Sequence, residues 1–236
     1  MLLNSWNAVH KMTEAMHSEL NDYVERISTA LAQHRTHSFS SQREVQLYLQ
    51  KTKKEILQAL HKSGAMLVEG LRILEDRKSS HVERVVSGYA AKLLKHLDSS
   101  KKLTAIIEDI LQDERSVLCF NEVVNSFYEC GDFHQELCVI IVFMTLFPFN
   151  PQPHISLGVL TWRRDGIDTA EHYYDSVVDA INNPALDYYA AECFYKNGKR
   201  GRAKDILNRA LSTVEKSPEI YGDKMMRDLR GLFAKV

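Results

Sequence analysis

Apolar residues recur at steps of three and four along the first half of the chain, a spacing that places them on one face of a helix. A first helix is predicted from about residue 4 to 33, with a stripe formed by Met16, Leu20, Tyr23, Ile27 and Ala30. Further helices are predicted at about 41–75, 80–97 and 103–111, and two of them begin with a serine and a glutamate in capping-box spacing, Ser41 with Glu44 and Ser80 with Glu83. Residues 1–112 are therefore predicted to form an antiparallel helical bundle or a coiled-coil hairpin.

The second half of the chain repeats one helix-turn-helix pattern three times. Compact residues near the middle of a predicted helix, Val124, Gly158 and Ala191, are spaced 34 and then 33 residues apart. A turn containing glycine follows each of them, at 131–133, 165–167 and 198–200. A period of 34 residues with small residues at the helix crossings is typical of the tetratricopeptide repeat. The predicted fold is all-α: the helical region 1–112, three tetratricopeptide-like helix pairs over 113–217, and a capping helix over 218–236 that covers the apolar end of the stack.

Stacked repeats of this kind leave a concave groove, and the first helix of each pair is predicted to line it. One frame position holds an aromatic residue in every unit: Tyr128, Trp162 and Tyr195. A large ring with a polar tip suits peptide binding, whereas the alternative is that some of these rings pack into the neighbouring helix. The predicted groove positions are Asn121, Asn125 and Tyr128 in the first unit, Ile155, Val159, Trp162 and Arg163 in the second, and Tyr188, Glu192, Tyr195 and Lys196 in the third.

Composition and charge give no support to a nucleic-acid or membrane partner, and in this indirect way they favour a protein partner. The formal net charge is −1, so nothing draws the whole chain to nucleic acid or to an anionic membrane. Four cysteines without a C-x-x-C pair are interpreted as buried, reduced thiols of a cytosolic protein. No signal peptide is apparent, and the longest apolar run, residues 137–149, is too short to span a bilayer. A cytoplasmic protein without stable membrane insertion is predicted.

The sequence contains no complete motif of the kinds that carry catalytic or metal chemistry. The ten histidines include no pair with two further ligands at zinc-site spacing. A glycine-rich phosphate loop, a G-x-S-x-G elbow and an H-E-x-x-H helix are also missing from the sequence. The basic cluster at 199–204 lacks interleaved aromatic residues, which disfavours a nucleic-acid interface. The sequence predicts a binding protein that is not an enzyme and needs no metal or cofactor.

Three segments carry a more specific signal: residues 127–133, 154–158 and above all 189–198, where Ala191-Glu-Cys193 is followed by Gly198 and Ala203. Over about 117–214 the chain resembles the class II chaperones of bacterial type III secretion, the SycD/LcrH, IpgC and SicA-like proteins. The resemblance implies a cytoplasmic bacterial chaperone or adaptor that holds an extended segment of a translocator or other export substrate in the groove, and homodimerisation through N-terminal helices. Carried over by position, its groove residues are Tyr128, Phe133, Val159, Trp162, Tyr188 and Tyr195.

Two departures from the family pattern qualify this picture. Glu136 stands where a repeat normally has alanine, which predicts looser packing in the first unit. The family usually has one short N-terminal helix, whereas this chain has about 110 residues there. The alternative function is therefore a structural or regulatory component of the secretion apparatus that acts through the N-terminal helical region.

Overall fold

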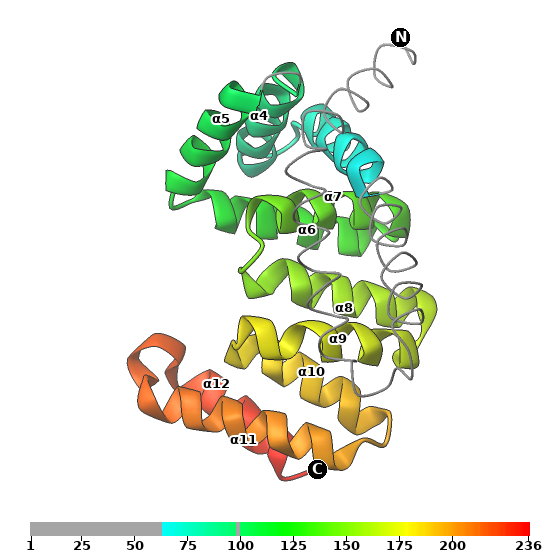
Figure 1. Cartoon of the computed structure of the whole chain (residues 1–236), viewed down its shortest axis with the longest axis vertical. Helices are drawn as coiled ribbons and strands as arrows, with labels where there is room; N and C mark the ends of the chain where they lie inside the picture. The colour runs from blue at the N-terminus through cyan, green and yellow to red at the C-terminus, as the bar shows by residue number, and fades with distance from the viewer. Residues whose placement is uncertain (1–62, 98–99) are drawn as a thin grey trace, which may run out of the picture. The chain divides into compact units, whose positions relative to one another are not determined.

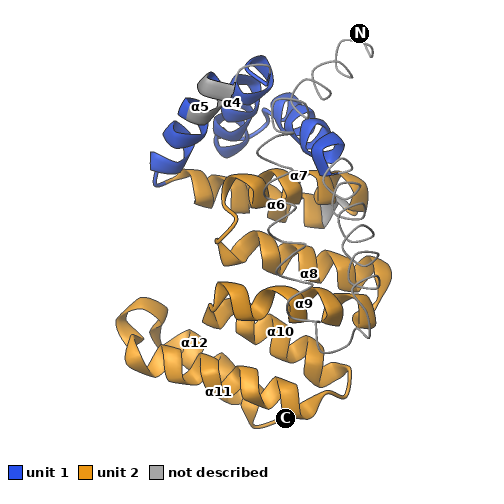
Figure 2. Cartoon of the chain, viewed as in Figure 1, with its two compact units in different colours: residues 1–114 blue, residues 115–236 orange. Residues whose placement is uncertain are grey.

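The computed structural model describes residues 63–97 and 100–236, and these contain helices, turns and irregular connections but no strand. The all-α prediction is confirmed for this part of the chain. Contacts divide the chain into two compact units, 1–114 and 115–236 (Figure 2). This division lies close to the boundary predicted between 112 and 113. The first predicted helix and most of the second fall outside the described residues.

The described part of unit 1 is helical at 63–76, in α4 (His81–Lys95) and in α5 (Ser100–Gln112). The capping box predicted at Ser80 is present: the Glu83 amide donates to Ser80 Oγ at 3.0 Å, and the Ser80 amide donates to Glu83 Oε2 at 3.1 Å. One face of α4 buries Val86, Ala90 and Leu93. The local start signal and the apolar stripe therefore agree on where this helix begins and which face it buries.

Unit 2 consists of helices that each pack on the next one along the chain (Figure 1). The helices that follow the glycine turns begin at Phe133, Ile167 and Arg200, which are 34 and 33 residues apart. Gly131, Gly166 and Gly198 have φ values of 74°, 94° and 78°, which only glycine adopts without strain. The helices are α6 (Ser116–Cys130), α7 (Phe133–Leu146), α8 (Pro151–Asp165), α9 (Ile167–Ile181), α10 (Pro184–Lys196), α11 (Arg200–Lys216) and α12 (Pro218–Phe233).

Helix starts in unit 2 follow local chemistry. The Asn150 side chain accepts from the Gln152 amide at 2.9 Å, and the Asn183 side chain accepts from the Ala185 amide at 2.9 Å. A proline occupies the first position of α8, α10 and α12, where its missing N–H would have no helical partner and its φ is already helical. Within α12, Gly222 breaks the helical geometry with φ 69° and ψ 168°. The residues after this kink return to α11 and bury Leu229 and Leu232.

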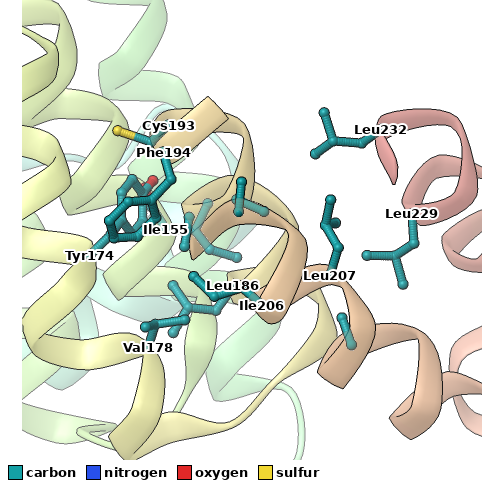
Figure 3. Packing of buried hydrophobic residues seen from close by; sticks show 14 of the residues in the cluster. Ile155, Tyr174, Val178, Leu186, Cys193, Phe194, Ile206, Leu207, Leu229 and Leu232 are labelled. Atoms are coloured by element: carbon teal, nitrogen blue, oxygen red, sulfur yellow. The ribbon is translucent and has the colours of Figure 1, made fainter. Parts of the chain in front are cut away.

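A continuous apolar cluster joins α8 to α12. Figure 3 shows the rings of Tyr174 and Phe194 together with Ile155, and Leu207 of α11 facing Leu229 of α12. Each aliphatic side chain buried here contributes about 1.5–3 kcal/mol relative to full exposure.

The crossing of α8 and α9 is closest at Gly158. A Cβ built there would lie 2.1 Å from Cζ of Tyr174, whose side chain is 1% exposed. The compact residue predicted at the middle of this helix is thus required by the ring that packs against it.

Asp187 and His154 are buried polar residues of unit 2 that have hydrogen-bond partners. Asp187 is 0% exposed and accepts from Arg209 Nη2 at 2.6 Å and Nε at 3.3 Å, while Arg209 also donates to Asp179 at 2.6 Å. His154 makes hydrogen-bond contacts through Nδ1 to the Tyr173 hydroxyl at 2.8 Å and through Nε2 to the Pro148 carbonyl at 2.9 Å. Burial raises the pKa of Asp187 despite Arg209, and burial lowers the pKa of His154.

None of the helices in the described ranges combines the length and the apolar character that crossing a membrane requires.

Candidate functional site

The first helices of the repeat pattern, α6, α8 and α10, supply most of the lining of an aromatic pocket of about 270 Å³. We call it the Trp162 pocket. Tyr128 of α6 and Tyr189 of α10 remain 49% and 39% exposed, which is unusual for large rings in a packed helical unit. The lining residues are Tyr128, Val159, Trp162, Arg163, Tyr174, Tyr189 and Glu192. The pocket therefore presents ring faces together with one cation and one carboxylate.

One side of the Trp162 pocket is built around Arg163. Its guanidinium carbon lies 4.1 Å from the centre of the Tyr128 ring and 4.9 Å from the centre of the Phe133 ring. Its Nη1 lies 3.2 Å from Oε2 of Glu136, whose side chain is 2% exposed. Burial raises the pKa of Glu136, and the charge and hydrogen bond of Arg163 oppose that increase. Glu136 is thus a buried carboxylate paired with Arg163.

A similar arrangement of a cation, a ring and a carboxylate lies beside Trp162. The Lys196 ammonium lies 4.9 Å from the centre of the Trp162 ring and 2.8 Å from the Glu192 carboxylate one helical turn earlier. Arg163 in the lining and Lys196 beside it therefore each have an aromatic face and a carboxylate as neighbours. The charges compensate pairwise, so the pocket offers polar groups without a strong net potential.

A second pocket of about 320 Å³ adjoins the first, and we call it the Tyr221 pocket. Tyr189 belongs to the lining of both pockets, so the two cavities share this residue. α8, α10 and the kinked helix α12 supply its lining, which is Gln152, Ile155, Ala185, Tyr188, Tyr189, Tyr221, Lys224, Met225 and Asp228. The rings of Tyr188 and Tyr189 meet edge to face, with centroids 5.6 Å apart. Two adjoining pockets of this composition can take large apolar side chains and offer hydrogen bonds at their rims.

Seven predicted groove residues line these pockets. The Trp162 pocket contains Tyr128, Val159, Trp162, Arg163 and Glu192, and the Tyr221 pocket contains Ile155 and Tyr188. Phe133 contacts the lining residue Arg163. Lys196 contacts the lining residues Trp162 and Glu192.

Three predicted groove residues lie elsewhere. Tyr195 is half-buried against the apolar cluster, with the Arg200 guanidinium 5.8 Å from its ring centre. Asn121 and Asn125 line neither pocket. The shared aromatic frame position therefore places two rings, Tyr128 and Trp162, in one pocket and packs the third into the helices.

Comparison of the repeats does not reveal the two tyrosines that complete the Trp162 pocket. The residues equivalent to Tyr189 in the earlier units are Glu122 and Ser156, so no aromatic recurs at that frame position. The usable signal is helical spacing, because Tyr189 stands three residues before Glu192 and shares its face. Tyr174 lies on a second helix at a core position, and its ring reaches the pocket from α9.

Comparison of the chain with family models, with curated proteins and with solved structures gives no match.

Proposed function

We propose that residues 115–236 form a tetratricopeptide-like array that binds an extended segment of a protein client across the Trp162 and Tyr221 pockets. The observation that carries the proposal is the pair of adjoining aromatic pockets that share Tyr189, lined in part by α6, α8 and α10, the helices that the repeat frame assigns to the concave face. Neighbouring pockets that share a residue suit a chain that presents successive side chains.

The chemistry of the lining supports a peptide over a small, highly charged ligand. Tyrosine and tryptophan supply contact area at a low cost in rotamer entropy, and they dominate surfaces that bind polypeptides. The compensated charges of Arg163 and Glu192 suit a ligand of little net charge. The pocket volumes of about 270 and 320 Å³ lie at the small end of ligand sites, which fits single large side chains.

The resemblance over residues 117–214 supports a more specific form of the proposal. In this form the protein is a cytoplasmic chaperone or adaptor of a bacterial type III secretion system, and its client is a translocator or another export substrate. The stretch Ala191-Glu-Cys193 that carries the resemblance lies in α10, the helix that lines both pockets.

Selection from a phage-displayed random-peptide library on the full chain, followed by calorimetry with the synthetic peptides recovered, tests the binding activity. We expect Tyr189→Ala to weaken binding about thirtyfold or more, because loss of a central aromatic anchor typically costs at least about 2 kcal/mol. Phe149→Ala is the matched control, since Phe149 is 84% exposed and lines neither pocket. Equal affinities for Tyr189→Ala and the wild-type chain would sink the proposal.

Co-expression with candidate translocators tests the client class. The wild-type chain and Phe149→Ala should keep a true client soluble, whereas Tyr189→Ala should release it into the insoluble fraction. A translocator held equally well by all three proteins would show that its binding does not use these pockets.

A further inference from the structure

Glu136 is a costly residue at its place in the fold. Helix stacking requires only a small apolar residue at this position, yet the chain buries the carboxylate of Glu136, which is 2% exposed. Burying an ion pair seldom stabilises a protein more than well-packed apolar side chains would. The Glu136–Arg163 pair is therefore poorly explained by stability alone.

The pair fixes the orientation of Arg163. Glu136 of α7 engages only Nη1, at 3.2 Å and 3.5 Å from its two oxygens. The rings of Tyr128 and Phe133 lie 4.1 Å and 4.9 Å from the guanidinium carbon. A planar guanidinium between a carboxylate and two rings loses most of its freedom before any ligand arrives.

Held in this way, Arg163, which belongs to the lining of the Trp162 pocket, keeps unused donors. Within residues 63–97 and 100–236, neither Nε nor Nη2 of Arg163 donates to a protein acceptor. The charge of Arg163 is already compensated by Glu136, and that of Lys196 by Glu192. A ligand carboxylate at these N–H groups would be repelled by Glu136, which already compensates the charge of Arg163, whereas a neutral carbonyl oxygen can accept from them without that repulsion.

Building on the proposed function, we propose that Glu136 is a positioning residue that holds Arg163 as the hydrogen-bond donor to a main-chain carbonyl of the bound segment. Every extended polypeptide offers such carbonyls, whatever its side chains. The pocket thus fixes the path of the client backbone, and its aromatic walls select the side chain that follows. The role explains why this repeat departs from alanine at that position.

A double-mutant cycle on binding of the selected peptide tests this role in the full chain. Glu136→Gln keeps the shape of the side chain and removes its charge, and Arg163→Lys keeps the charge but lacks the planar fork. We expect each single variant to weaken binding about tenfold, as loss of a hydrogen bond to a charged group does. The double variant should bind no more weakly than Arg163→Lys, because Glu136 acts only through the guanidinium.

Two controls separate this role from a general loss of structure. Glu215→Gln breaks the exposed Glu215–Arg230 pair, whose atoms lie 3.4 Å apart and which lines neither pocket, so it should leave the dissociation constant unchanged. Nitrogen NMR of the arginine side chains in the ligand-free protein should show restricted rotation of the Arg163 guanidinium in the wild type and averaged signals in Glu136→Gln. Circular dichroism checks that each variant is folded.

The outcomes distinguish the two proposals. If Tyr189→Ala weakens the peptide and Glu136→Gln does not, or if the two losses in the cycle add, the positioning role is wrong and the peptide site stands. If no selected peptide depends on Tyr189, both proposals fall. A peptide that loses binding when its acidic side chains are replaced by amides, or whose affinity falls steeply on a roughly tenfold rise in salt, would overturn the neutral carbonyl as the acceptor.

Discussion

Gly158→Ala is expected to destabilise the protein although alanine is the better helix former. The added Cβ would lie 2.1 Å from Cζ and 2.4 Å from Oη of Tyr174, whereas carbon atoms in contact are about 3.5–4.0 Å apart. Tyr174 is 1% exposed and packed between helices, so its ring must leave its place in the core or α8 and α9 must separate. Overpacking of this kind costs up to about 3 kcal/mol, and alanine returns about 1 kcal/mol of helix propensity. The expected net loss in the free energy of unfolding is about 2 kcal/mol.

Urea unfolding followed by circular dichroism measures this loss. Gly201→Ala is the matched control, because a Cβ at Gly201 in α11 meets nothing within 4 Å and the substitution should stabilise by about 0.5–1 kcal/mol. In a Tyr174→Ala background the clash is gone, so Gly158→Ala should itself become stabilising by up to about 1 kcal/mol. Equal stabilisation by Gly158→Ala and Gly201→Ala in the wild-type chain would refute the close approach of α8 to the Tyr174 ring.

Three further predictions concern buried titratable groups. Arg209→Met should cost about 2–4 kcal/mol at neutral pH because it leaves the Asp187 carboxylate buried without its cation. That loss should shrink on acidification, because burial raises the pKa of Asp187 and the folded state therefore binds its proton more tightly than the unfolded state does. Urea titrations at about pH 7 and pH 5 measure the loss, and a larger loss at the lower pH would contradict this expectation. Burial lowers the pKa of His154, so the unfolded state binds its proton more tightly and stability falls as the pH drops below about 6.5. His154→Asn should flatten that fall by up to about 1.4 kcal/mol per pH unit, and an unchanged slope between about pH 7 and pH 5 argues against it. Burial raises the pKa of Cys193 to about 11, so iodoacetamide at about pH 8 should label it about a hundredfold more slowly in the folded chain than in urea, as read by peptide mass spectrometry; similar rates would contradict its burial.

The helix boundaries of unit 2 could be predicted because they lie at residues with few conformational choices. Gly131 and Gly198 adopt positive φ at the turns, and Pro184 fits only the first turn of a helix. The rotation of each helix is a harder problem, since moving by one residue turns a side chain by about 100°. Tyr188 and Tyr189 illustrate it: the repeat frame favoured Tyr188, whereas Tyr189 is the residue that lines both pockets.

Ion pairs between helices could not be predicted, for a different reason. Glu136 and Arg163 lie on different helix pairs, and Asp187 meets Arg209 across 22 residues. Neither pair has a periodic or local signature, because each depends on how two helices cross. The repeat frame identified Glu136 as unusual but carried no information on which cation would reach it.

The distance in sequence between Glu136 and Arg163 also bears on the synthesis of the protein. The two residues are 27 positions apart, and a ribosome adds about 5–20 residues per second. Glu136 is therefore synthesised roughly 1–5 s before its guanidinium partner. Throughout that interval an ionised Glu136 favours water over the interior of its helix pair. Translation of α8 is thus the event that allows the preceding pair to close.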